Sequence, residues 1–88
     1  MKSRNVSFSP EAVNQLGELS KVSSKLVGKL TELLDDCMRS PFTGRGKPEP
    51  LKGDLSGYWS RRINDEHRLV YRVDDEYIYV FSCKGHYD

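Results

Sequence analysis

The sequence predicts an α+β domain, in which two helices precede most of a small antiparallel sheet of about four strands. Two observations favour this class. Apolar residues recur at helical spacing between residues 10 and 39, and three strand-like runs follow one another between residues 58 and 83. The 88 residues are enough for one hydrophobic core and too few for two, so we expect a single domain over residues 1–88.

The first residues predict a short strand followed by a helix. Between Arg4 and Phe8, apolar and polar residues alternate, which is typical of a strand with one buried face. Ser9-Pro10-Glu11 then indicates a helix start, because serine is a good N-cap, proline fits the first helical position and an acid suits the first turn. The apolar positions of this helix are expected to be Val13, Leu16 and Leu19.

A second, longer helix is predicted from about Lys21 to Arg39. Its apolar residues recur at steps of three and four, so they form one stripe by which the helix would lie on the sheet. Pro41 ends this helix, because the residue before a proline is disfavoured in the helical region. The stripe consists of Val22, Leu26, Leu30, Leu33, Leu34 and Cys37.

Residues 41–54 predict a loop within the domain, since three prolines and three glycines occur in fourteen residues. Glu49 lies in this loop between Pro48 and Pro50. Two fixed φ angles would hold the backbone around Glu49 without engaging its carboxylate. Such an arrangement suits a group that must be aimed at a ligand.

The remaining residues predict an antiparallel meander. If both of its turns have three residues, Arg62 opposes Arg68, Arg68 opposes Ser82, and alternation along the last strand brings His86 to the same face. Two arginines directly opposite each other destabilise a sheet unless an anion lies between them, so this face predicts an anion site. The strands are expected at residues 58–63, 68–73 and 77–83, and the turns at residues 64–66 and 74–76.

Charge and cysteine content exclude several classes of protein. Residues 39–72 carry eight Lys and Arg against four Asp and Glu, although the net charge of the chain is only +1. This basic middle favours a polyanion such as RNA over a membrane. Cys37 and Cys83 fit neither a zinc site nor a disulfide scaffold, and we expect them to be reduced core residues. No apolar run has the length of a signal peptide or a membrane span, so we expect a cytoplasmic protein.

The charged residues of this region match what RNA cleavage without a metal requires. The reaction needs a base for the 2′-OH proton, cations for the charge that builds on the phosphate, and an acid for the departing 5′-oxygen. Glu49 and His86 are the candidates for the proton transfers. No cluster has metal-ligand spacing, and no Gly-rich phosphate loop is present. The cations expected to handle phosphate are Lys47, Lys52, Arg61, Arg62 and Arg68.

Each of these residues also has an ordinary structural interpretation. Glu49 can be a solvated loop acid, and His86 can be a histidine in a frayed terminus. Arg62 and Arg68 can form surface ion pairs with the carboxylates of the two turns. Aromatic residues in the strands are more often core than base-stacking platforms, whereas Tyr87 lies in a polar tail and favours a contact with a ligand or partner.

Four stretches of the chain stand out together: GKPEPLK at residues 46–52, LSGYWSRRI at residues 55–63, EHRLVY at residues 66–71, and the terminal His86-Tyr87. They resemble the YoeB/Txe family of bacterial toxins, which belongs to the RelE superfamily of toxin–antitoxin endoribonucleases. The resemblance covers residues 41–73 and the tail, whereas residues 1–40 match only in layout.

The resemblance implies a microbial ribonuclease-like fold with both helices on one face of the sheet. It also implies ribosome-dependent cleavage of mRNA in the 30S A site, by metal-independent acid–base transesterification without a cofactor. By position, Glu49 is similar to the general base, His86 to the general acid, and Arg68 to the arginine on the scissile phosphate. Lys52 and Arg62 match accessory phosphate contacts, and Tyr87 matches the tyrosine that orients the substrate.

The resemblance further implies a homodimer and a cognate antitoxin of the YefM/Axe kind, whose tail folds over the site. Asp88 is a departure, because it follows Tyr87 where many relatives end. A competing function is a non-catalytic RNA- or ribosome-binding inhibitor of translation, which would need the arginines and aromatics but neither Glu49 nor His86. A ribonuclease acting on free RNA also stays open.

Overall fold

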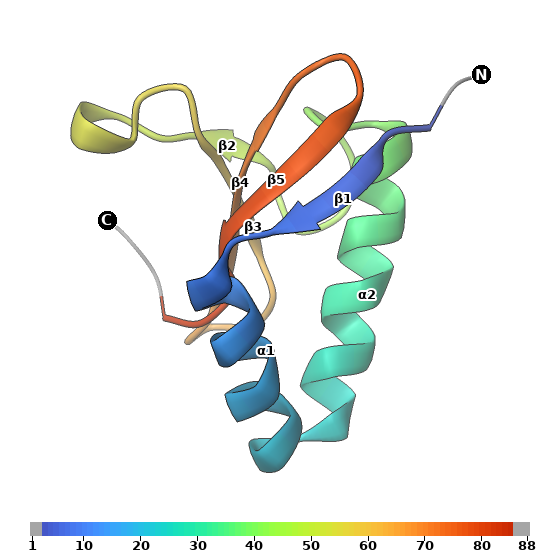
Figure 1. Cartoon of the computed structure of the whole chain (residues 1–88), viewed down its shortest axis with the longest axis vertical. Coiled ribbons are helices and arrows are strands. Elements are labelled where there is room, and N and C mark those ends of the chain that lie inside the picture. The colour runs from blue at the N-terminus through green and yellow to red at the C-terminus, as the bar shows by residue number, and fades with distance from the viewer. Residues whose placement is uncertain (1–2, 86–88) are drawn as a thin grey trace.

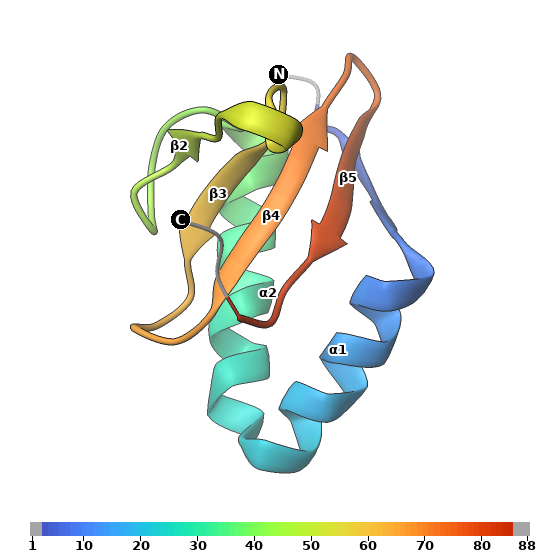
Figure 2. The same cartoon turned by 90° about the vertical axis from the view of Figure 1, so that its left-hand side faces the viewer.

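The computed structural model describes residues 3–85, and it shows two helices on one face of a five-stranded sheet (Figures 1 and 2). The predicted class is confirmed, with two differences. A fifth, two-residue strand pairs with the edge of the predicted meander, and the N-terminal strand runs parallel to its neighbour. The sheet order is β1-β5-β4-β3-β2, with β1 at Asn5–Phe8, β2 at Glu49–Pro50, β3 at Trp59–Arg62, β4 at Arg68–Val73 and β5 at Tyr77–Ser82.

Helix α1 (Pro10–Val22) begins where the sequence predicts. The Ser9 hydroxyl accepts a hydrogen bond from the Ala12 backbone N–H at 3.0 Å and donates one to the Phe81 carbonyl at 2.9 Å, so one side chain caps the helix and ties it to β5. Ala12 and Leu19 enter the core. The prediction that Val13 also lies in the core is wrong, because this residue is 54% exposed.

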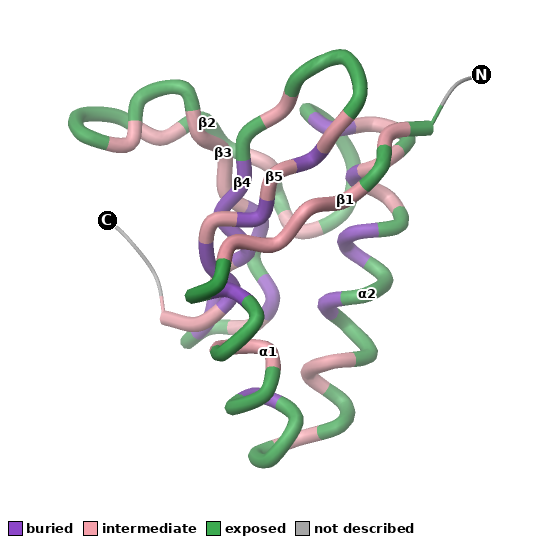
Figure 3. Tube along the Cα trace, in the orientation of Figure 1, coloured by how far each residue is buried: buried purple, intermediate pink, exposed green. Residues whose placement is uncertain are grey.

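Helix α2 (Ser24–Arg39) begins three residues later than predicted. Ser23 has an extended backbone, ends α1 and caps α2 by accepting the Leu26 N–H, so Val22 belongs to the end of α1 and lies in solvent. The rest of the stripe behaves as expected. Buried residues concentrate on β4 and β5 and on the helix sides that face them (Figure 3), and those of α2 are Leu30, Leu33, Leu34 and Cys37.

Leu30→Ala is expected to lower the free energy of unfolding by about 2 to 5 kcal/mol, because it removes a fully buried side chain from the shared core. Urea denaturation followed by circular dichroism measures the loss. Val22→Ala is the matched control, since a 75% exposed valine should change stability by less than about 0.5 kcal/mol. Equal midpoints for the two variants would show that the stripe is not the core.

The strand register confirms that Arg62 directly opposes Arg68, whereas the predicted pairing of Arg68 with Ser82 is wrong. Val73 pairs with Ile78, one residue beyond Tyr77, and a bulge follows at which Ser82 opposes Val70. The pairing of Val73 shifts β5 by one residue relative to the prediction, and the bulge shifts it by one more. Either shift alone would turn Ser82 to the other face of the sheet, whereas the two together leave it on the predicted face. Ser82 therefore still shares a face with Val70, and by alternation along β4 with Arg68 and Arg62.

The two faces of the sheet differ in character. The helices cover one face with an apolar core to which the sheet contributes Ile63, Leu69, Tyr71, Ile78 and Val80. The other face carries the opposed arginines and is not covered by either helix (Figure 2). No helix in the described part of the chain is long and apolar enough to cross a membrane.

Candidate functional site

A cleft of about 460 Å³ lies on the open face of the sheet, between the loop that carries β2 and the strands β3 and β4. The described residues that line it are strongly charged and include a single carboxylate and four cations. The charged residues are Lys47, Glu49, Lys52, Arg62 and Arg68, so the structure brings together five of the eight residues that the sequence singles out.

The loop is fixed to β3 by backbone hydrogen bonds on both sides of Glu49. The Arg62 N–H donates to the Gly46 carbonyl at 2.6 Å, and the Leu51 N–H donates to the Tyr58 carbonyl at 2.9 Å. Between them, Glu49 pairs with Ser60 across the short β2–β3 ladder. The position of the Glu49 backbone therefore follows from the sheet.

Gly46 allows the loop to approach the sheet this closely. Its φ is +80°, and a Cβ there would lie 3.0 Å from the Arg62 carbonyl oxygen and 3.1 Å from Arg61 Cβ and from a Leu33 methyl. A side chain would push the loop off β3, and with it the segment that leads to Glu49.

The Glu49 side chain is exposed, and no hydrogen-bond or ion-pair partner for its carboxylate lies within residues 3–85. An unpaired carboxylate in a basic cleft is unusual, because a neighbouring lysine or arginine would ordinarily neutralise it. Glu49 is thus available to a ligand.

The two opposed arginines are held differently. The Arg62 side chain is 49% exposed, and its Nη1 lies 3.9 Å from Oδ1 of the fully exposed Asp65. Arg62 thus forms the surface ion pair considered above, but at this distance and exposure the pair is weak. Arg68 Nη1 donates to the carbonyls of Asn64 at 2.6 Å and of His67 at 3.2 Å. Its Nε and Nη2 have no partner among the described residues, and none of the described carboxylates neutralises it. The Arg68 fork is therefore oriented by backbone and free to bind an anion.

His67 anchors the end of the described chain next to Arg68. The Gly85 N–H donates to His67 Nδ1 at 2.9 Å, and the Arg68 N–H donates to the Gly85 carbonyl at 2.8 Å. His67 thus has a structural role, because its ring holds the backbone at Gly85. His86 and Tyr87, the predicted acid and orienting tyrosine, follow directly but lie outside the described residues.

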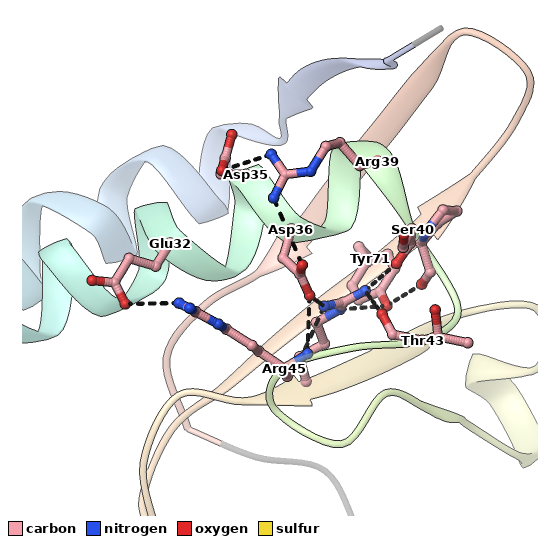
Figure 4. A network of polar contacts seen from close by, with 10 residues as sticks. Glu32, Asp35, Asp36, Arg39, Ser40, Thr43, Arg45 and Tyr71 are labelled. Atoms are coloured by element: carbon pink, nitrogen blue, oxygen red, sulfur yellow. Dashed lines mark hydrogen bonds and ion pairs between the residues drawn. The ribbon is translucent and has the colours of Figure 1, made fainter. Parts of the chain in front are cut away.

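Arg61 is not part of the cleft, which corrects its assignment to phosphate binding. Because successive side chains of a strand point to opposite faces, Arg61 lies on the helix side, opposite Leu69, while Arg62 faces the cleft. Arg61 is fully buried and binds Asp36 of α2 and Tyr71 of β4. Figure 4 labels these two partners within the polar network.

The sequence reasoning missed Asp36 and the polar role of Tyr71. The Arg45 backbone N–H and then the Arg61 guanidinium hold the pKa of Asp36 below its usual range, despite some desolvation. Burial raises the pKa of the Tyr71 hydroxyl, which therefore stays protonated. A signal was present, since the predicted register already placed Arg61 opposite the apolar Leu69.

The described residues contain no group of three or more His, Cys, Asp or Glu side chains that could hold a metal ion. The chemistry available in the cleft is that of one free carboxylate and several cations. Such a site can bind a phosphodiester through the cations and accept a proton through the carboxylate.

The family model, a sequence relative and two solved structures to which the chain is similar all point to the same family of toxins. A family model described as a YoeB-like toxin of bacterial type II toxin–antitoxin systems matches residues 8–87, well beyond the region that suggested the resemblance. Toxin YoeB from Mycobacterium bovis is 46% identical over 84 residues, which cover 96% of this chain and 99% of that protein.

Two solved structures from Staphylococcus aureus share the fold. A YoeB dimer matches with a TM-score of 0.89 at 48% identity, covering 98% of this chain and 100% of that one. A YoeB–YefM complex matches with a TM-score of 0.86 at the same identity and coverage.

Proposed function

Because this chain belongs to the YoeB-like toxin family of bacterial type II toxin–antitoxin systems, we propose that it is an endoribonuclease that cleaves mRNA on the ribosome and so inhibits translation. The observation that most supports the proposal is the cleft itself. In it, the unpaired carboxylate of Glu49 shares one surface with Arg62, Arg68 and two lysines.

The proposed reaction is a transesterification within the RNA. Glu49 removes the proton from a 2′-OH, and the 2′-oxygen attacks the adjacent phosphorus. The bond from phosphorus to the 5′-oxygen breaks, His86 protonates that oxygen, and a 2′,3′-cyclic phosphate forms. Arg68 stabilises the negative charge that develops on the phosphoryl oxygens, and Tyr87 orients the substrate.

The remaining cations fit phosphate binding along the cleft. Arg62 and Arg68 repel each other across the β3–β4 ladder, and a phosphate between them would replace that repulsion with two charge-assisted contacts. Lys47 and Lys52 lie on the loop side of the same cleft, where they would contact neighbouring phosphates. This reaction uses no metal and no cofactor.

A non-catalytic binder of RNA or ribosomes is the alternative function. In such a protein the carboxylate of Glu49 would repel the phosphate that the four cations attract, and it would weaken binding for no gain. Its exposed, unpaired position in the cleft therefore favours the enzyme.

The partners follow from the same reasoning and from the relatives. Since the S. aureus YoeB proteins occur as a dimer and in a complex with YefM, we propose that this chain also forms a homodimer and binds a YefM-like antitoxin. Acidic groups of the antitoxin would be suited to the cations of the cleft. Action on ribosomes would require that the protein be cytoplasmic, and we propose that location.

Primer extension on a message translated with purified protein tests the proposal. We expect cuts in the A-site codon only when ribosomes are present, products that end in a 2′,3′-cyclic phosphate or its hydrolysed form, and resistance of a message with a 2′-deoxy substitution at the cut. Cleavage should also survive chelation of metals in any component that does not itself need magnesium. Inhibition of translation without any cut message would support the binder, and equal cutting without ribosomes would show an enzyme for free RNA.

A further inference from the structure

The buried guanidinium of Arg61 has all of its hydrogen-bond donors occupied. Nε donates to the Tyr71 hydroxyl at 3.1 Å, and Nη1 donates to Asp36 Oδ2 at 2.9 Å. The other three donors bind backbone carbonyls, those of Arg45 at 3.0 Å, Ser40 at 2.5 Å and Thr43 at 2.8 Å. Five N–H groups thus meet five acceptors, the full capacity of an arginine.

Most of these contacts converge on one short loop, residues 40–45 (Figure 4). This loop connects α2 to residues 46–52, most of which line the cleft. The Tyr71 hydroxyl donates to the Pro41 carbonyl at 2.6 Å, and Asp36 Oδ2 accepts the Arg45 N–H at 2.9 Å. We call Asp36, Arg61 and Tyr71 the loop clamp. The three side chains come from α2, β3 and β4, so the clamp fastens the loop to three elements at once.

The clamped loop leads directly into the cleft. Gly46 follows Arg45 and accepts the N–H of Arg62, and a Cβ at Gly46 would lie 3.1 Å from Arg61 Cβ. Lys47 then reaches the cleft with a φ of +51°, and Glu49 pairs with β3. Arg61 and Arg62 are neighbours in the chain, yet one holds the loop from the helix side and the other faces the cleft.

From this geometry we propose that the loop clamp positions Glu49 for its role as base, by fixing the path of residues 40–46 and thereby the place of the carboxylate relative to Arg62 and Arg68. This inference rests on the proposed function and adds to it three positioning residues on the far side of the sheet. None of the three lines the cleft.

Stability alone does not account for the clamp. Burying a charged arginine carries a large desolvation penalty, and well-packed apolar residues in its place are often as stable. What the clamp provides instead is one defined conformation for a loop with few backbone hydrogen bonds of its own. Among the described residues these are the Ser40 N–H to the Asp36 carbonyl at 2.9 Å, at the end of α2, and the Thr43 N–H to the Ser40 carbonyl at 3.4 Å.

Tyr71→Phe tests the proposal, because it removes the hydroxyl that joins Arg61 to Pro41 and keeps the buried ring. We expect amide hydrogen exchange to quicken about tenfold in residues 41–50 and to stay unchanged in β4 and β5. Since a base displaced by about 1 Å loses on the order of a hundredfold in rate, kcat should fall by about that factor while KM changes by less than about threefold.

Asp36 supplies a second test with its own conservative variant. Asp36→Ala removes the acceptor and should behave like Tyr71→Phe, whereas Asp36→Asn keeps an oxygen for Arg61 and Arg45 and should restore most of the rate. Arg39→Ala is the control, because Arg39 lies 3.8 Å from the other Asp36 oxygen, is half exposed and does not bind the loop. It should leave exchange and rate within about twofold, as expected for a weak surface pair.

The outcomes separate the two proposals. Faster exchange throughout the protein, or an unchanged kcat for folded Tyr71→Phe and Asp36→Ala, would reduce the clamp to a stabilising contact and overturn the inference. Wild-type protein that binds ribosomes without cutting would overturn the proposed function, and the exchange of residues 41–50 would then still decide whether the clamp holds the loop.

Discussion

Arg68→Ala is expected to lower the rate of RNA cleavage by about a hundredfold to a thousandfold, the usual effect of removing a donor from a developing negative charge. The Arg68 fork is oriented by the Asn64 carbonyl and is not neutralised by any described carboxylate, so its charge is available to the phosphate. Arg68→Lys should also be impaired, since a point charge cannot make the forked contact.

The Arg68→Ala variant should fold almost as well as wild type. It relieves the repulsion with Arg62, worth up to about 1 kcal/mol, and gives up the Nη1 hydrogen bonds to the Asn64 and His67 carbonyls, of which the longer is the weaker. Single-turnover cleavage and thermal denaturation measure the two effects separately.

Arg72→Ala provides the charge-matched control. Arg72 lies four residues further along β4, on the same face by alternation, but outside the cleft and stacked over the Tyr79 ring at 4.1 Å. It should retain most of the activity. If Arg68→Ala cleaves as well as Arg72→Ala, Arg68 does not stabilise the scissile phosphate.

Glu49→Gln is expected to slow cleavage by about a hundredfold to ten-thousandfold, the range for a lost general base, and to leave binding to ribosomes intact or slightly tighter. The side chain is exposed and has no described partner, so folding should not change. Removing its negative charge from a cleft with four cations favours phosphate binding. Rates under saturating ribosomes, together with a binding isotherm, separate the two effects.

Asp54→Asn is the matched control for Glu49→Gln, because Asp54 is an exposed acid on the same loop that does not line the cleft. His86→Ala should resemble Glu49→Gln if His86 is the acid. Full inhibition of translation by both Glu49→Gln and His86→Ala would instead favour the non-catalytic binder.

Several features could be predicted from the sequence because their causes are local. The Ser9-Pro10 start of α1 depends on groups within one helical turn, and the stripe of α2 on a simple period. The opposition of Arg62 and Arg68 follows from a short turn that joins adjacent strands. The family resemblance is confirmed by the family model that matches residues 8–87. Its motif at residues 46–52 also contributes Lys47, Glu49 and Lys52 to the cleft.

The predicted strand register and the predicted start of α2 were wrong by one to three residues, at places where the backbone departs from regular geometry. The β5 bulge and the longer turn before it leave no mark in the alternation of apolar and polar residues. The break at Ser23 is equally hard to see, because the apolar spacing of α1 continues almost unchanged into α2. The parallel pairing of β1 with β5 joins segments about 72 residues apart, for example Asn5 and Tyr77. Periodicity within either segment does not encode such a pairing.

By itself, the sequence determined the two helices and four of the five strands to within a few residues, the face shared by the opposed arginines, and the residues suited to acid–base chemistry. Only the tertiary structure decided which cations line the cleft together with Glu49, and that Arg61 is not among them. Arg61 and Arg62 are adjacent and chemically identical, so their neighbours in the chain do not distinguish them. What separates them is alternation across the sheet together with partners 10 to 25 residues away, Tyr71 and Asp36, which only folding brings to one side.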